Sequence, residues 1–449
     1  MIRILQKPVS AAPLAIFRIA FGAMLFLSTV RFWAKGWIAE LYIKPKYFFP
    51  FYGFEFIKPL GEYTYLLFAV CAISALFVAF GFLYRMASVS LFVSFTYVEL
   101  IDKSTYLNHY YFVSVVCFML IFLPARVFFS IDAYRDKKIM ADKIPAWCAL
   151  SLQILVGILY FYAGIAKLNS DWLLEALPLK IWLPARNDMP VIGFLFNYKW
   201  IPFVFSWFGC LYDLTIPFLL AYKKTRLFAF AAVVIFHGLT AVLFPIGLFP
   251  YIMIVTALIF FSGDSHLKIV KAISGVFRWN STFINSGKTF HFSESSNAAL
   301  LAFFSVLLLI QMILPFRYLL YPGELFWTEE GYRFSWRVML MEKAGYTQFQ
   351  VQDDSGKSLI INNNLFLTTL QEKMMSTQPD MILQYAHILR DYYANHGFSN
   401  PKIYVDSYVA LNGRLGKPLV SPDVNLAEQT ETFQHKIWIT PLNDEIKGF

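Results

Sequence analysis

Residues 146–172 read AWCALSLQILVGILYFYAGIAKLNSDW, and they decide what kind of fold this chain adopts. The apolar part, 146–166, is long enough for one helix to cross a bilayer. Lys167 follows it directly, with Asp171 and Trp172 close behind. Taken alone, the pattern is typical of a membrane helix whose terminal lysine reaches the interface beside an anchoring tryptophan. The alternative is that Lys167 acts as a base in a partly dry pocket.

The composition of the whole chain is that of a membrane protein. Hydrophobic residues make up 58% of the 449 residues and charged residues 15%, whereas soluble domains carry about a quarter charged residues. The 38 Lys+Arg exceed the 29 Asp+Glu, which gives a net charge of +9. In such a chain this surplus indicates membrane topology more than a nucleic-acid site. We therefore expect membrane lipid, and no nucleic acid, among its partners.

Several classes of site are excluded because their sequence motifs are absent. The four cysteines lie in or beside apolar runs, none lies in the polar C-terminal third, and none forms a CxxC pair. There is no GxSxG, HExxH or P-loop sequence, and the histidine spacings suit no metal site. We expect neither a disulfide framework in the polar part nor a bound metal.

Apolar runs predict about nine membrane spans. They cover residues 14–33, 62–82, 86–101, 107–125, 146–166, 200–221, 226–244, 248–262 and 298–315. The runs 86–101 and 248–262 are the weakest, and either is compatible with a re-entrant segment. Residues 1–13 lead straight into the first run, so we expect a signal-anchor helix there and not a cleaved signal peptide.

Basic residues predict the orientation. If the N-terminus is cytoplasmic, the inner side receives the loop 126–144, with five Lys and Arg residues, and the cluster at 223–226. The C-terminal part then lies outside. Asn280-Ser-Thr282 matches the glycosylation pattern but falls on the inner side, so we expect it to be unmodified.

Beyond residue 315 the pattern changes to that of a small α+β domain. Alternation in 346–352, a turn at 353–356 and a strand at 358–361 predict a β-hairpin. Helices are expected at 367–376 and 380–394, and strands at Ile403–Leu411 and Lys436–Thr440. The predicted fold is a polytopic α-helical membrane protein, N-in and C-out, with a transmembrane domain at 1–315 and an extracytoplasmic domain at 316–449.

Ionisable residues in the spans are costly and each needs a reason. They are Arg18, Glu99, Asp102, His109, Lys167, Asp213 and His237. The predicted topology brings His109, Lys167 and His237 together in the outer leaflet, which favours a site there. Asp213 and Arg18 are interpreted as structural charges, held by an ion pair or by free backbone carbonyls. Taken alone, His237 would be a core histidine bonded to a neighbouring helix.

Several motifs resemble a known family. Tyr160–Trp172 resembles the YFxAGxxKLxxDW stretch of the vitamin K-dependent γ-glutamyl carboxylases. Asp102–His109 resembles their DKxxxxNH segment, and His237–Tyr251 their HxxxxxLFxIGxFxY segment. Further matches in the same order are Phe326-Trp327-Thr328, Tyr332–Trp336, Pro401–Asp406, Asn412–Arg414 and Asp423-Val424. The resemblance runs from about Arg18 to Gln429 and is to a short, bacterial-type member with the HTTM membrane domain.

The resemblance implies a chemistry and a set of roles. In that family reduced vitamin K, a naphthohydroquinone, is oxygenated by O2 to its epoxide, and the reaction drives carboxylation of a peptide glutamate with CO2. Lys167 would take the hydroquinone proton as a neutral amine, which an apolar site favours. The other implied roles are positioning or protonation by Asn108 and His109, quinone-pocket lining by His237, Tyr162 and Trp172, and glutamate binding by Tyr332, Trp336 and Arg414.

The chain also departs from the family. Animal members have a histidine shortly after the Ser-Trp pair, where this chain has Met339-Leu340-Met341. They also continue beyond this length and carry a disulfide, whereas no cysteine follows Cys210 here. We expect a bacterial inner-membrane protein with a periplasmic C-terminal domain. The alternatives are a quinol epoxidase that does not carboxylate and a non-catalytic quinone-binding protein or transporter. A transporter is disfavoured because the ionisable groups lie at one membrane face and no internal repeat is present.

Overall fold

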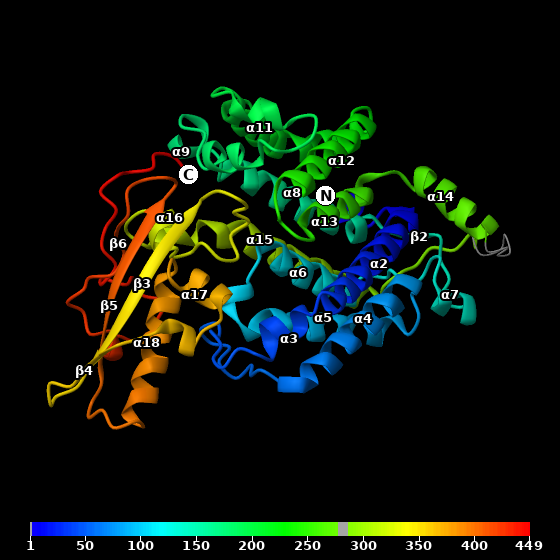
Figure 1. Ribbon diagram of the computed structural model, residues 1–449. Coiled ribbons are helices and arrows are strands. Elements are labelled where there is room, and N and C mark those ends of the chain that lie inside the picture. The colour runs from blue at the N-terminus through cyan, green and yellow to red at the C-terminus, as the bar shows by residue number, and fades with distance from the viewer. Residues whose placement is uncertain (1, 277–285) are drawn as a thin grey trace.

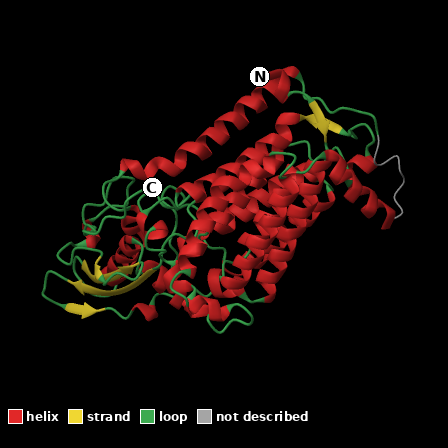
Figure 2. Ribbon diagram, turned by 90° about the horizontal axis from the view of Figure 1, so that it is seen from above, coloured by secondary structure: helices red, strands yellow, loops and turns green. Residues whose placement is uncertain are grey.

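The computed structural model describes residues 2–276 and 286–449. A helical bundle takes up the first two thirds of the chain, and an α+β domain lies at one end of it (Figures 1 and 2). The main helices are α2 (Ala12–Ala34), α4 (Thr64–Phe80), α5 (Tyr84–Ile101), α6 (Asn108–Phe122), α8 (Ala146–Ile165), α11 (Ile201–Ala221), α12 (Arg226–Leu243), α13 (Phe249–Ala257), α14 (Gly263–Val276) and α15 (Glu294–Ile313). Short helices connect them: α1 (Ile2–Leu5), α3 (Trp37–Tyr42), α7 (Ile131–Arg135), α9 (Ser170–Leu173), α10 (Leu179–Trp182) and α16 (Leu325–Thr328). The sequence Asn280-Ser-Thr282 lies outside the described residues.

Fewer helices qualify as membrane spans than the apolar runs predict. In the described part of the chain, six helices are long and apolar enough to cross a membrane. A seventh span would join 249–260 to α14, but the two parts are bent by 112°, as in a broken span or a re-entrant loop. Helix α6 is apolar but short, and α5 is diluted by hydroxyl side chains and by Arg85 and Glu99. Six to seven apolar helices identify an integral membrane protein.

Arg18 fastens two neighbouring elements to α2. Its guanidinium donates hydrogen bonds to the carbonyls of Val78 and Ala79, at 2.8 and 2.6 Å, and to that of Phe129 at 2.5 Å. These are carbonyls at the end of α4 and in the loop after α6. Arg18 therefore has backbone carbonyls as partners, the second of the two arrangements expected for it. A buried guanidinium is tolerated here because several acceptors face it.

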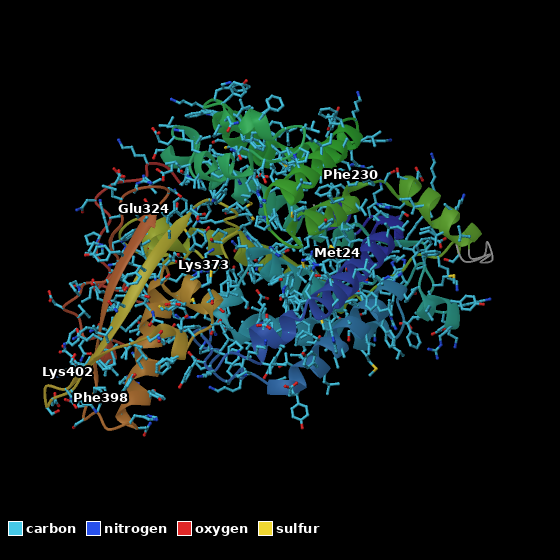
Figure 3. All side chains as sticks on the ribbon, in the orientation of Figure 1. Met24, Phe230, Glu324, Lys373, Phe398 and Lys402 are labelled. Atoms are coloured by element: carbon cyan, nitrogen blue, oxygen red, sulfur yellow. The ribbon has the colours of Figure 1, made fainter. Side chains whose placement is uncertain are left out.

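The C-terminal domain is a four-stranded antiparallel sheet with two helices on it. Its strands are β3 (Lys343–Gln352), β4 (Ser358–Ile360), β5 (Lys402–Leu411) and β6 (Lys417–Pro418), in the order β4-β3-β5-β6, and its helices are α17 (Thr369–Met375) and α18 (Pro379–Ala394). A second, two-stranded sheet pairs β1 (Pro8–Ser10) with β2 (Lys143–Pro145) at the far end of the bundle. Figure 3 shows Phe398 and Lys402 at the free end of the C-terminal domain, and Met24 and Phe230 within the bundle.

The predicted hairpin, both helices and the strand at Ile403–Leu411 are confirmed. The strand expected at Lys436–Thr440 is wrong. That segment makes one isolated bridge, Ile439 with Val420, and a turn in which Ile439 N–H bonds the carbonyl of Lys436. A turn within five residues leaves no room for an extended ladder.

The C-terminal domain is held to the bundle through the loop after α5. Gln371 of α17 donates to the buried carboxylate of Asp102 at 2.9 Å. Lys103 pairs with Asp380, at the start of α18, at 2.8 Å. Burial opposes ionisation of Asp380, but the charges of Arg333 and Lys103 outweigh it and hold the pKa of that carboxyl well below its usual range. This ion-pair cluster fixes the domain above the ends of α5 and α6.

Candidate functional site

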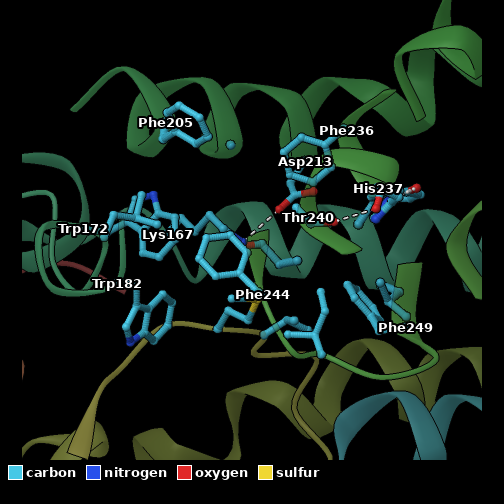
Figure 4. Close-up of a pocket in the computed structure, with 18 residues that line it drawn as sticks. Lys167, Trp172, Trp182, Phe205, Asp213, Phe236, His237, Thr240, Phe244 and Phe249 are labelled. Carbon is cyan, nitrogen blue, oxygen red and sulfur yellow. Dashed lines mark hydrogen bonds and ion pairs between the residues drawn. The ribbon is translucent and has the colours of Figure 1, made fainter. Parts of the chain in front are cut away.

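Lys167 lies in the turn that follows α8. Tyr160, Ala163 and Lys167 fall on one face because they are three and four residues apart. The ammonium donates to the carbonyl of Ala163 at 3.0 Å and forms an ion pair with Asp213 of α11 at 2.8 Å. Both charged residues are only 6% exposed. Figure 4 shows the pair at the wall of a cavity. Lys167 is therefore a buried, paired group and not an interfacial anchor.

Close packing of α8 on α11 brings Asp213 within reach. Gly164 faces α11, and a Cβ added there would lie 2.7 Å from the side chain of Leu214 and 2.8 Å from its backbone nitrogen. Only glycine permits this approach of the two helices. Asp213 was expected to be a structural charge held by an ion pair or by backbone carbonyls; it forms an ion pair, with Lys167, in the cavity wall.

His237 comes to the same cavity from α12. Its Nε2 shares a hydrogen bond of 2.9 Å with the hydroxyl of Tyr160. The side chain is 1% exposed, and its Nδ1 has no hydrogen-bond partner among the described residues. A buried nitrogen without a partner is costly, so it is a natural point of contact for a ligand oxygen.

The cavity itself is mostly apolar and aromatic, with about 690 Å³ of space not filled by atoms. Lys167, Asp213, His237 and Tyr160 supply most of its polar groups. The remaining lining residues are Leu159, Ala163, Trp172, Leu179, Trp182, Phe205, Gly209, Phe236, Thr240, Phe244, Ile246, Phe249, Val338 and Met339. The Trp172 ring lies 5.3 Å from the Lys167 ammonium, an arrangement that favours a cation. Aromatic walls with a few convergent polar groups are typical of a site for a flat organic ring.

A second, larger hollow adjoins the first, between the bundle and the C-terminal domain. It spans about 2260 Å³ between its atoms, open solvent included, and is lined by Asn108, His109 and Tyr332, among others. Both hollows share Ile246, Phe249, Val338 and Met339. The ring of Phe249 lies 5.7 Å from that of His237 and 5.8 Å from that of His109. A thin partition of side chains therefore separates two sets of candidate residues.

Polar groups in the second hollow are also incompletely paired. The Asn108 side chain accepts from the Tyr106 hydroxyl at 2.7 Å and donates to the carbonyl of Arg337. Buried nitrogens of His109 (Nε2) and of Arg337 (Nε and Nη1) have no hydrogen-bond partner among the described residues. Burial lowers the pKa of Arg337 and raises that of Tyr332. An incompletely paired guanidinium in a groove is suited to an incoming carboxylate.

Three predicted site residues do not line either hollow. Tyr162 lies about 200° around α8 from Tyr160, and its hydroxyl donates to the carbonyl of Met312 instead. Trp336 is completely buried, stacks on Tyr111 at 5.0 Å and donates to the carbonyl of Gln311. Arg414 is engaged by Asp171, as described next. These three side chains therefore lie outside both hollows, and the roles expected for them stay predictions.

Arg414 and Asp171 form a clamp between the α8–α9 turn and the C-terminal domain. The guanidinium makes two hydrogen bonds to the Asp171 carboxylate, at 2.6 and 2.7 Å, and a third to Asp444 at 2.5 Å. Asn412 donates at 2.7 Å to Oδ2 of Asp171, the oxygen that also accepts the 2.6 Å bond from Arg414. This bidentate geometry is the strong form of an arginine–carboxylate contact. The clamp holds the chain four residues beyond Lys167.

Other residues of the site were missed by sequence reasoning. Tyr160 could have been found from its seven-residue spacing to Lys167, which puts both on one helix face. Arg337 directly follows the Ser335-Trp336 pair but belongs to no quoted motif. Phe249 lies inside a quoted motif and carried no role. Met341, which stands near the position of the animal histidine, lines the second hollow.

Two known families match this chain. Residues 6–264 match the HTTM domain, and residues 296–445 match the vitamin K-dependent gamma-carboxylase, lumenal domain. The chain belongs to the vitamin K-dependent γ-carboxylase family. No solved structure matches it. The lumenal-domain region contributes Val338 and Met339 to the first cavity, so both matched parts of this carboxylase-family chain build the candidate site.

Proposed function

We propose that the protein is a vitamin K-dependent γ-glutamyl carboxylase that epoxidises reduced vitamin K with O2 and carboxylates peptide glutamate with CO2. The observation that carries the proposal is the Lys167–Asp213 pair, which faces an aromatic cavity beside His237. When bound, reduced vitamin K supplies, through its reaction with O2, a base strong enough to remove the γ-proton of glutamate.

The residues present fit such a ring system. The cavity, with about 690 Å³ of space between its lining atoms, open solvent included, combines aromatic faces with a few polar groups, as small-molecule sites do. Trp182, Phe205 and Phe244 provide faces against which a flat ring packs. His237 Nδ1 has no partner among the described residues and offers a hydrogen bond to a ring oxygen. The aromatic wall also excludes water, which strengthens each polar contact inside.

Lys167 acts as the proton acceptor in this proposal. An amine accepts a proton only when it is neutral, whereas the ion pair holds it charged. Asp213 resolves this conflict, because transfer of one proton from Nζ to its carboxylate leaves a neutral amine beside a neutral acid. Neither product is a buried isolated charge. Nζ then accepts a hydroxyl proton, and the ammonium that forms is balanced by the negative charge left on the ligand, while Asp213 keeps the proton that it took.

The second hollow holds the glutamate side of the reaction. Tyr332 lines it, and Arg337 presents to a carboxylate two nitrogens that have no hydrogen-bond partner in the described part of the chain. His109 and Asn108 lie on the same side of the Phe249 partition. In the proposal they position the reacting groups, and His109 returns a proton as the cycle closes.

The direct test uses purified protein with vitamin K hydroquinone, a glutamyl peptide and ¹⁴CO2. Wild type forms both epoxide and labelled peptide. Lys167→Ala forms neither although the protein still folds, and a small exogenous amine restores part of the epoxidation. Lys180→Ala, which removes an exposed lysine of a surface pair, serves as the matched control. Full activity of Lys167→Ala removes this residue from the mechanism.

A second candidate is an epoxidase that does not carboxylate. The observation that favours it is Met341, which lines the second hollow near the position where animal members carry a histidine. Epoxide formation without label in the peptide identifies this function. Met341→His then restores carboxylation if that side chain is the missing element.

We also infer an N-in orientation in a bacterial inner membrane, with the 316–449 domain outside. It is supported by the basic loop 126–144 at the end of the bundle remote from that domain (Figure 1). The four native cysteines are buried. An impermeant thiol reagent on intact cells should therefore label Ser399→Cys and leave Lys137→Cys unlabelled; the opposite pattern reverses the orientation.

A further inference from the structure

A basic cluster lies at the end of the bundle remote from the candidate site. Two adjoining hollows there share Arg85, Arg126 and Ile139. They are lined by three arginines and two lysines, against two carboxylates: Arg85, Arg126, Arg135, Lys138 and Lys288, with Asp132 and Asp136. The balance within the hollows is three positive charges.

The carboxylates of this cluster are engaged elsewhere. Asp132 accepts the backbone N–H groups of Leu83 and Tyr84, both at 2.9 Å, and so caps the start of α5. Asp136 accepts the N–H of Lys138 at 3.0 Å. Among the described residues, neither Arg85 nor Arg126 has an ion pair or a side-chain hydrogen bond. Charge bias alone places basic residues on this side, but it does not gather unpaired arginines around one hollow.

Arg85 and Arg126 also repel each other, which favours an anion between them. Partial burial, and then the nearby charge of Arg85, lower the pKa of Arg126. An anion between them would relieve both effects, because it replaces lost hydration and screens like charges.

Apolar surface continues from the hollows along the outside of the bundle. Leu83 and Met86, which line the first hollow, are 44% and 73% exposed, and Val89 follows on the same face of α5 at 44%. Phe122, Phe290 and other apolar side chains also line the second hollow. A ligand that fits is therefore amphiphilic, with an anionic head and apolar chains.

We propose that these two hollows bind the phosphate headgroup of an anionic phospholipid, whose acyl chains lie along α5. Arg85 and Arg126 contact the phosphate, and Arg135 and Lys138 close around it. The site is separate from the quinol cavity and does not depend on the proposed reaction. We assign the ligand as a lipid and not as free phosphate, because the hollows adjoin the exposed apolar side chains of Leu83, Met86 and Val89.

Native mass spectrometry of the full chain in detergent, titrated with phosphatidylglycerol, tests the proposal. Arg85→Gln/Arg126→Gln should weaken binding about 30-fold, as expected for two cations near an anionic headgroup. Lys268→Gln/Lys271→Gln, which removes the same charge from exposed positions of α14, should leave it unchanged. Phosphatidylcholine should not compete with phosphatidylglycerol.

A charge-preserving variant separates loss of binding from loss of folding. Arg85→Lys/Arg126→Lys preserves charge and should retain most of the binding even if the glutamine variant folds poorly. Equal loss of affinity in the α14 control and the arginine variant would overturn the site. Displacement of the lipid by inorganic phosphate at matched concentration would overturn the assignment to a phospholipid.

Discussion

A single ion pair determines what Lys167 can do. A snorkelling lysine ends in water, whereas here the ammonium ends on Asp213 at 2.8 Å inside the protein. Burying the pair is costly because both charges lose their hydration. Removing either partner would leave an isolated buried charge. That cost makes sense if the pair exchanges a proton during the reaction. In the proposed mechanism Asp213 is therefore a partner of the base, which its interpretation as a structural charge did not include.

The first prediction concerns Asp213→Asn. This change preserves shape but removes the group that takes the proton from the Lys167 ammonium, so epoxidation should fall by about 100-fold, a typical effect of acid–base groups. The double variant Lys167→Ala/Asp213→Asn should be no slower than Lys167→Ala alone, because the two residues act as one unit. Single and double variants are compared by epoxide formation rates. Additive losses would show that Asp213 acts independently.

At the scale of elements, the connection from α4 to α5 depends on one glycine. Gly81 ends α4 with φ +61°, a left-handed conformation that side chains disfavour. A Cβ there would overlap the side chain of Ser130 and lie 2.6 Å from Arg18 Nη1. Arg18 cannot withdraw without losing its carbonyl partners on α4. The turn, the buried arginine and the loop after α6 are therefore one packed unit.

The second prediction follows from this unit. Gly81→Ala should lower the stability of the protein by about 2–4 kcal/mol, from a strained φ together with overpacking. Gly238→Ala is the matched control, since a Cβ at that position of α12 meets nothing within 4 Å. It should be neutral or slightly stabilising, because alanine favours helices. Thermal unfolding in detergent measures both. A similar loss in both variants would contradict the packing argument.

Much at the level of elements could be predicted from sequence. Helices such as α8 and α18 were located because periodicity and end signals are local. The strand predicted at Lys436–Thr440 was wrong, because the hydrogen bond from Ile439 N–H to the carbonyl of Lys436 closes a turn within this segment, although its apolar residues favour a strand. At the site, the predicted topology brought Lys167 and His237 to one side, and the structure adds that Tyr160 of α8, rather than Tyr162, lines the cavity with them. The partners of Lys167 and Arg414 were unpredictable, because they lie far away in the sequence and are chosen by packing.

At the scale of the whole molecule, the C-terminal domain touches the site from two directions. It contributes Val338 and Met339 to the cavity, and it holds the α8–α9 turn through the Arg414–Asp171 clamp. A bridge between Asn169 and Gly448 adds to this hold. Lys167 is thus positioned jointly by α8 and by the domain above it.

The third prediction separates two roles for Arg414. As a clamp, Arg414→Gln should lower the epoxidation rate about tenfold by loosening the Lys167 turn, with KM for the glutamyl peptide unchanged. Asp171→Asn should do the same.

Arg337→Gln should instead raise the peptide KM by about tenfold or more, as expected for a charged hydrogen bond to a carboxylate. Arg390→Gln, in an exposed pair, is the control. A raised peptide KM with unchanged epoxidation in Arg414→Gln would restore its role in glutamate binding.

The docking of the domain also predicts a pH dependence. Asp380 is about a fifth exposed and pairs with Lys103 and Arg333. Its pKa in the folded protein lies below the usual value of 3.8. The stability that it contributes is therefore present above about pH 4 and is lost as the pH falls further, because the unfolded chain takes up the proton first. The loss begins at the ordinary pKa of aspartate and not at neutral pH.

The fourth prediction is that Asp380→Asn lowers the unfolding temperature by about 5 °C at pH 7, as expected for a broken, partly buried ion pair. The difference from wild type should persist at pH 5 and begin to shrink at pH 3.5, where Asp380 of the unfolded wild-type chain takes up a proton. Scanning fluorimetry in detergent at the three pH values measures it, with Asp391→Asn of the exposed Arg390–Asp391 pair as control. A constant difference from pH 7 to pH 3.5 would mean that the Asp380 carboxylate does not carry the docking energy. In that case the remaining hold on the domain would rest on uncharged contacts such as that of Gln371 with the backbone of Tyr47.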